Sequence, residues 1–274
     1  MFGYRITRDP LRDRPYKVGL ALSGGGARGV AHAGAIKAML EVGLKPDIIA
    51  GVSAGAIVAV LYASGMSPEE MVSIFANAKF SDFCEFAVPK DGFFRMDGFR
   101  KLLKKVIPYT NIEDLPMPTV VTATDFDHGK RVAFETGQIA ERVSASCSIP
   151  IVFKPVEIDG VRYVDGGVLD NMPAWAIRER CKFLVGINCS PAPAESSKNN
   201  IVSIALHAYE LMMKNNSAAD QSLCDMLITT DQIADYKVFD LQGLQQVFDT
   251  GYNNTMAYFR ARGIEPKSQP AADR

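Results

Sequence analysis

The stretch Gly51-Val52-Ser53-Ala54-Gly55 constrains the fold of this chain more than any other feature of its sequence. An apolar run, Ile48-Ile49-Ala50, precedes it, and an alanine-rich helical pattern follows as far as about Ser64. This order predicts a strand, a tight turn and a helix, with Ser53 on the turn between glycines that let the backbone pass closely. The serine hydroxyl would then lie at a helix N-terminus, where unpaired N–H groups favour negative charge. The motif alone is equally typical of a glycine-rich turn with a capping serine, so other segments must decide.

A second glycine-rich turn precedes this one. Val18-Gly19-Leu20-Ala21-Leu22 is an apolar run of strand length, typical of a strand buried on both faces of a parallel sheet. Helical periodicity then runs from Val30 to Leu40, and Lys45-Pro46-Asp47 turns the chain into the next strand. Residues 18–51 therefore predict a right-handed β-α-β unit.

The loop between the first strand and the helix, Gly24-Gly25-Gly26-Ala27-Arg28-Gly29, satisfies the G-x-G-x-x-G pattern of dinucleotide-binding units. That interpretation requires an acid at the carboxyl end of the second strand, but this chain has Gly51-Val52-Ser53 there. No Gly-Lys-Ser/Thr follows the loop, which excludes a P-loop. What remains is a set of backbone N–H groups beside Ser53, which is the arrangement of an oxyanion hole. A phosphate- or nucleotide-binding module that uses this loop stays as an alternative.

Composition narrows the class of protein. A chain of 274 residues can bury one large core, and we expect an N-terminal arm over 1–15, a single domain over 16–263 and a flexible tail over 264–274. A net charge of −1, without a block of Lys or Arg, argues against a nucleic-acid partner. The basic N-terminal arm lacks the apolar segment of a secretory signal, and the longest apolar window, near 56–63, is too short to span a membrane. We therefore expect a cytoplasmic protein whose contact with a membrane is at most peripheral.

The cysteines indicate neither a disulfide framework nor a metal site. They are odd in number, widely spaced and without a C-x-x-C pair or a neighbouring histidine cluster. We expect reduced structural thiols, no metal and no other cofactor. The five are Cys84, Cys147, Cys181, Cys189 and Cys224.

Several later segments carry weaker signals. Aromatic residues are scattered from Phe80 to Phe99, which predicts either a long loop pinned to the core or a mobile apolar flap beside a site for acyl chains. Residues 173–180 predict a helix, and the polar residues 191–200 predict a surface loop. An amphipathic helix follows, and we expect its apolar stripe to face the core. That stripe comprises Ile201, Ile204, Ala205, Ala208, Leu211 and Met212.

A nucleophilic serine needs a base, and the histidines are poorly placed to supply it. His32 lies in the first helix, His128 in a turn and His207 in an amphipathic helix, so a three-member triad is not supported. Asp165-Gly166-Gly167 follows a predicted strand and places an acid at its end. Asp-Gly is a common turn, yet a carboxylate held near Ser53 could act as the base directly. Asp165 is therefore the strongest candidate for this role.

Together the three motifs resemble those of the patatin-like phospholipases, in order and in approximate spacing, over roughly residues 16–190. The resemblance implies a three-layer α/β/α sandwich around a mostly parallel sheet, and hydrolysis of lipid acyl esters by a Ser-Asp dyad without metal. The family's third motif is often Asp-Gly-Ala, where this chain has Asp165-Gly166-Gly167. Carried over by position, Ser53 is the nucleophile and Asp165 the general base. The oxyanion hole is assigned to the amides of Gly24, Gly25, Gly26, Ala27, Arg28 and Gly29.

We therefore expect a lipid acyl hydrolase of the phospholipase A or esterase type that works through an acyl-enzyme. Its expected partner is a lipid or other acyl-ester substrate. A catalytically silent or regulatory relative that keeps the dyad but closes access to it is the second hypothesis, and the nucleotide-binding module is the third.

Overall fold

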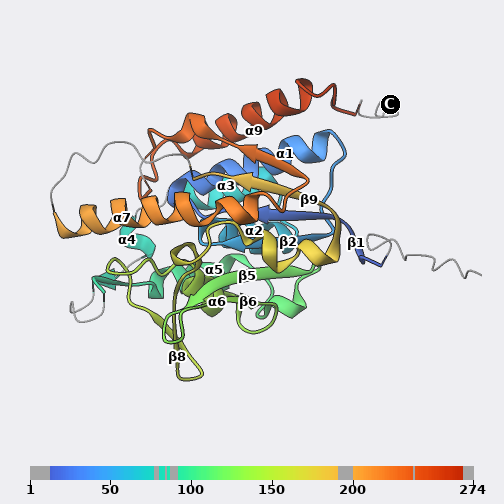
Figure 1. Ribbon diagram of the computed structural model, residues 1–274. Coiled ribbons are helices and arrows are strands. Elements are labelled where there is room, and N and C mark those ends of the chain that lie inside the picture. The colour runs from blue at the N-terminus through green and yellow to red at the C-terminus, as the bar shows by residue number, and fades with distance from the viewer. Residues whose placement is uncertain are drawn as a thin grey trace, which may run out of the picture.

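A mixed, mostly parallel sheet of eight strands lies at the centre of the molecule (Figure 1). The computed structural model describes residues 13–76, 80–83, 85–86, 92–190, 200–236 and 238–267. The strands follow the order β10-β9-β1-β2-β5-β8-β7, and β6 pairs with β5. The pairs from β10 to β5 are parallel, whereas β6, β7 and β8 run antiparallel to their neighbours. Their bounds are β1 Tyr16–Leu22, β2 Ile48–Val52, β5 Thr119–Asp125, β6 Lys130–Phe134, β7 Val156–Ile158, β8 Val161–Asp165, β9 Cys181–Asn188 and β10 Met226–Thr229.

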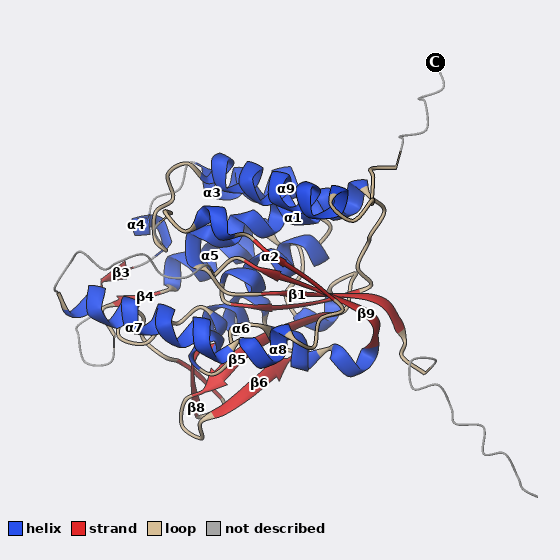
Figure 2. Cartoon of the chain, turned by 45° about the horizontal axis from the view of Figure 1, so that its top comes forward, coloured by secondary structure: helices blue, strands red, loops and turns tan. Residues whose placement is uncertain are grey.

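Helices cover both faces of this sheet, which confirms the predicted α/β/α layering (Figure 2). Alternate residues of one strand serve opposite layers: Leu20 and Leu22 pack into the larger core, while Ala21 packs into the smaller one. The larger core lies under α1 Val30–Glu41, α2 Ala54–Ala63, α3 Pro68–Ala76, α5 Asp97–Val106, α6 Ile139–Ser146 and α9 Leu244–Arg260. The smaller core lies against two 3-10 helices, η4 Pro173–Ala176 and η5 Arg178–Arg180, and α8 Ala218–Gln221 contacts η4.

Short elements complete the described chain. They are η1 Gly26–Gly29, α4 Phe80–Phe83, β3 Glu85–Phe86, β4 Phe94–Arg95, η2 Ile112–Asp114, η3 Gly166–Val168 and η6 Asp231–Ile233. The long helix α7 spans Ile201–Asn216. β3 and β4 pair with each other in a separate two-stranded sheet. The 1–15 arm, the 191–200 loop, the tail and Cys84 lie wholly or largely outside the described residues.

The structure corrects two predictions. Residues 173–180 form two short 3-10 helices instead of one continuous helix, because tertiary hydrogen bonds hold this segment: the buried Arg178 guanidinium donates to the carbonyl of Cys181 and to Asp225. The apolar stripe of α7 does not face the core. Ile201 and Ile204 are 71% and 60% exposed, and the opposite face of the helix, with the buried Tyr209, packs inward instead.

Candidate active site

Ser53 occupies the predicted strained turn between β2 and α2. Its backbone has φ 52° and ψ −122°, a conformation that side-chain-bearing residues rarely adopt. The turn is so tight that a Cβ on Gly51 would lie 2.3 Å from the carbonyl oxygen of Gly55, so only glycine fits there. The Ser53 amide donates to the Ser146 hydroxyl at 2.8 Å, and that hydroxyl donates to the Thr122 carbonyl at 2.6 Å. These contacts hold the serine rigidly at the strand end.

The pairing of β5 brings Asp165 beside Ser53. β2 ends at Val52, which pairs with Thr122, and β8 pairs with β5 from the next position, where Asp165 lies opposite Ala123. The parallel and the antiparallel strand thus end toward each other along one edge of β5. This register brings together two residues that are more than a hundred positions apart in the chain.

Asp165 is fully buried, and its electrostatics suit a base. Burial raises its pKa to about 6, while hydrogen bonding from the Ser53 hydroxyl, the Gly167 amide and the Tyr209 hydroxyl opposes this rise. The Gly167 amide donates to Oδ1 at 2.9 Å. Oδ2 and the Tyr209 hydroxyl are both buried without a hydrogen bond of good geometry to a described residue. The carboxyl group is therefore ionised near pH 7 and is poised to accept a proton.

The glycine loop between β1 and α1 lies against this serine. Gly26 has φ 60°, and together with Ala27, Gly29 and Ser53 it lines one cavity. Two of the six predicted oxyanion donors are engaged elsewhere: the Gly24 amide donates to Asn171 Oδ1 at 3.1 Å, and the Ala27 amide donates to the Val238 carbonyl at 2.7 Å. These bonds anchor the loop and remove Gly24 and Ala27 as free donors. The amides of Gly25 and Gly26 are not hydrogen-bonded within the described part of the chain.

Arg28 anchors the same loop from inside. Its side chain is buried, donates to Glu210 on α7 at 2.8 Å and donates to the Gly25 carbonyl at 3.3 Å. Because a buried guanidinium must be paired, this contact connects the loop to α7. Arg28 thus positions the loop, and its charge is neutralised by Glu210.

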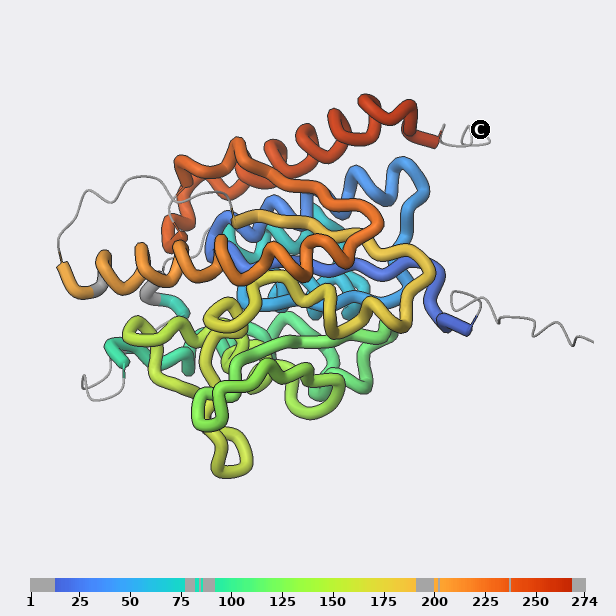
Figure 3. Tube along the Cα trace, in the orientation of Figure 1, coloured from blue at the N-terminus to red at the C-terminus, as the bar shows by residue number. Residues whose placement is uncertain are grey.

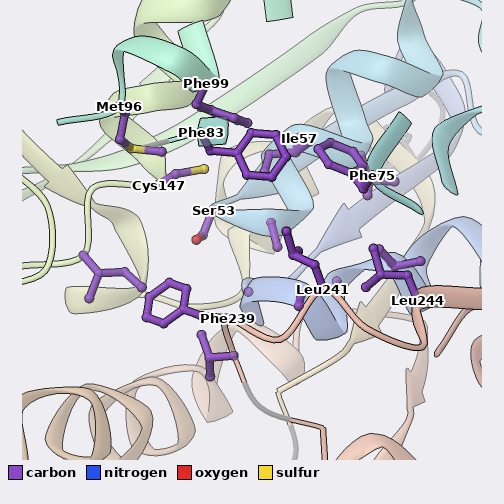
Figure 4. Close-up of a pocket in the computed structure, with 18 of the residues that line it drawn as sticks. Ser53, Ile57, Phe75, Phe83, Met96, Phe99, Cys147, Phe239, Leu241 and Leu244 are labelled. Carbon is purple, nitrogen blue, oxygen red and sulfur yellow. The ribbon is translucent and has the colours of Figure 1, made fainter. Parts of the chain in front are cut away.

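An apolar pocket opens at Ser53. Figure 4 shows the serine hydroxyl at this pocket, below Cys147 and across from Phe239. The cavity has a volume of about 150 Å³, and aliphatic and aromatic side chains dominate its wall. The predicted aromatic segment 80–99 contributes to that wall. Lining residues include Ile57, Phe75, Phe83, Met96, Phe99, Leu241 and Leu244.

Three residues near the site carried no sequence signal of their own. Tyr209 lies in a segment whose sequence predicts a helix, and Asn171 lies in a segment whose sequence predicts a loop. Neither residue belongs to a motif. Cys147 is buried in the pocket wall beside Ser53 and Asp165, and burial raises the pKa of its thiol well above its usual range. That thiol is protonated at neutral pH and is no competing nucleophile. A polar-tipped aromatic on the face opposite to the α7 stripe was the only available hint for Tyr209.

The histidines and the acidic residues do not suggest other chemistry. His32 is buried, burial lowers its pKa to about 4, and its ring bonds to the Ser23 carbonyl at 2.8 Å. His128 pairs with Asp125 on a turn. Within residues 13–267, outside the undescribed gaps, no group of three or more His, Cys, Asp or Glu could hold a metal ion.

Among the helices of the described residues, none has an apolar stretch of the length that a membrane span requires.

Fold and site define an α/β/α protein that presents a strained serine and a buried aspartate beside an apolar pocket. The family model for patatin-like phospholipases matches residues 20–177, and the chain belongs to this family.

Curated relatives include an uncharacterized NTE family protein of Mycobacterium bovis, 33% identical over 74% of this chain and 57% of its own length. The lysophospholipase NTE1 of Scheffersomyces stipitis is 27% identical over 66% of this chain but only 12% of its own length. The chain thus spans little more than half of the first relative and a small part of the second.

Solved structures share the fold at low identity. VipD from Legionella pneumophila has a TM-score of 0.52 at 17% identity, covering 90% of this chain and 67% of its own. Human GIVD cytosolic phospholipase A2 also has a TM-score of 0.52, at 12% identity, covering 92% of this chain and 60% of its own. These likenesses confirm the predicted fold class.

Proposed function

We propose that this chain is a lipid acyl hydrolase in which Ser53 is the nucleophile and Asp165 the general base. The observation that carries the proposal is the register of β5, which sets the strained serine and a buried carboxylate side by side at an apolar pocket. Membership of the patatin-like phospholipase family and the likeness to a lysophospholipase support a lipid ester as the substrate.

The reaction follows from the charges at the site. Ser53 Oγ attacks the ester carbonyl as Asp165 accepts the hydroxyl proton, and the carbonyl oxygen becomes an oxyanion. The amides of Gly25 and Gly26, which bond to no described residue, are the donors we assign to that oxyanion, each contributing about 3–4 kcal/mol of transition-state stabilisation. The proton then passes from Asp165 to the leaving alcohol, and the acyl group stays on Ser53.

Deacylation uses the same base, with water as the nucleophile and Ser53 as the leaving group. Asp165 accepts a proton from water, the resulting hydroxide attacks the acyl carbonyl, and the proton returns to Ser53 as the free fatty acid leaves. The apolar pocket excludes other water and accommodates the acyl chain, which strengthens the interaction of the oxyanion with its donors.

Ser53→Ala and Asp165→Asn test this function. We expect both to lower kcat/KM for p-nitrophenyl esters and for lysophospholipids by about a thousandfold or more, and a fluorophosphonate probe to label Ser53 in the wild type alone. Ser73→Ala is the matched control, because Ser73 is an exposed serine on α3. Full activity of Ser53→Ala would overturn the proposal. Folded wild-type protein without turnover or labelling would instead identify the catalytically silent relative.

A further inference from the structure

Helix α7 is apolar on two faces, and only one of them has a partner in the described chain. Its inner face carries Leu206, Tyr209 and Met213, which pack with pocket residues. Its outer face repeats apolar residues at helical spacing, which we call the outer stripe: Ile201, Ile204, Ala208, Leu211 and Met212. Scattered exposed apolar residues are common, but a contiguous stripe on one helix marks a contact surface.

The inner face of α7 connects this stripe to the catalytic groups. Tyr209 lies against Asp165, and Glu210 pairs with Arg28 of the glycine loop at 2.8 Å. Asn216 donates to the Gly167 carbonyl at 2.8 Å. A surface that holds the outer stripe would therefore also orient the site, because α7 is bonded both to the glycine loop and to the segment that follows Asp165.

The amino end of α7 lies at the same end of the molecule as elements that line the pocket. Figures 1 and 3 show the start of α7 at the same end of the molecule as α4, and Figure 2 shows β3 and β4 at that end too. Phe83 of α4 and Met96, next to β4, line the cavity that contains Ser53. A flat apolar surface touching Ile201 and Ile204 would therefore meet the pocket side of the molecule.

The charges of α7 indicate what kind of surface this is. Between residues 201 and 213 the sequence has a single charged side chain, Glu210, and it points inward to Arg28. The outer stripe can therefore leave water without burying an unpaired charge. A helix that is apolar outward and packs against the wall of the pocket suits the boundary between headgroups and acyl chains of a lipid aggregate.

We propose that the outer stripe of α7 inserts into the surface of aggregated lipid and thereby places the Ser53 pocket over its substrate. This inference rests on the proposed function for its substrate class. It predicts binding driven by apolar area, so that high salt weakens the binding little.

Vesicle binding tests the surface without needing turnover. Ser53→Ala protein, alone and with Ile201→Gln and Ile204→Gln added, is sedimented with phosphatidylcholine vesicles. Glutamine preserves helix propensity while removing apolar area, and we expect the partition coefficient to fall by about tenfold or more. Leu223→Gln is the matched control: Leu223 is 37% exposed and precedes β10, at the amino ends of the parallel strands and opposite the site.

Activity measurements complete the test. A protein that retains Ser53 but carries Ile201→Gln and Ile204→Gln should keep the wild-type kcat/KM on a dissolved short-chain ester. Its kcat/KM on vesicle lipid should fall by about tenfold. Equal vesicle binding by the double variant and its parent would overturn the inference. So would a dimer that the double variant converts to monomer, since the stripe would then belong to a second copy. Absence of all turnover with intact stripe-dependent binding would reject the proposed function alone.

Discussion

Asp165→Asn should stabilise the protein while it removes the proposed base. Asp165 has no exposed surface, and burial raises its pKa from 3.8 to about 6. The folded chain therefore binds more protons than the unfolded chain between these pH values. The stability that this carboxyl contributes is fully present below about pH 3.8 and is lost as pH rises through about 6.

The size of the effect follows from that pKa. At 1.36 kcal/mol for each pH unit, the ionised carboxylate costs the fold about 3 kcal/mol at pH 7. Asparagine keeps an oxygen for the Gly167 amide, now bonded to Oδ1 at 2.9 Å, and carries no charge. We expect the free energy of unfolding at pH 7 to rise by about 2–3 kcal/mol, and Tm to rise by about 2–4 °C for each kcal/mol.

Urea unfolding at pH 7 and at pH 4 measures this difference. The advantage of Asp165→Asn should almost vanish at pH 4, where the wild-type carboxyl is largely protonated in the folded state. Asp159→Asn, in the exposed turn between β7 and β8, makes the same chemical change as a control and should show no such pH dependence. An Asp165→Asn variant that is less stable than the wild type at pH 7, or equally stabilised at both pH values, would refute the reasoning.

Three further outcomes are expected. Tyr209→Phe removes a hydroxyl that lowers the pKa of Asp165. The acidic limb of the pH profile of kcat/KM, which lies near pH 6 in the wild type, should therefore move to higher pH. An unmoved limb would contradict this role of Tyr209. Gly51→Ala places a Cβ 2.3 Å from the Gly55 carbonyl oxygen of α2. The free energy of unfolding in urea should therefore fall by at least about 2 kcal/mol. A neutral effect would show that the turn can relax. Arg28→Met leaves Glu210 unpaired. Because the Glu210 side chain is 19% exposed, we expect urea unfolding to show a loss below about 3–5 kcal/mol, the value for a fully desolvated pair. Adding Glu210→Gln should recover part of that loss in a double-mutant cycle.

The sequence determined the local structure around the site. Apolar runs bounded by glycine-rich turns specify β1, η1, α1, β2 and α2, because the periodicity and the space needed at Gly51 are properties of neighbouring residues. The same reasoning placed Ser53 on a strained turn and Asp165 at a strand end. The three motifs were also sufficient to indicate the family, which the match over residues 20–177 confirms.

Only the tertiary structure decided how these pieces meet. The convergence of Ser53 and Asp165 depends on where β2 stops and β8 begins along β5, and strand register is set by long-range packing. The same holds for the Gly24 and Ala27 amides, whose acceptors come from Asn171 and Val238. On α7 the sequence shows two apolar faces of equal period, and periodicity cannot say which one the core will bury. The face with Tyr209 is buried because the polar contacts of Glu210 and Asn216 fix the rotation of the helix. Ile201 and Ile204 therefore stay in water.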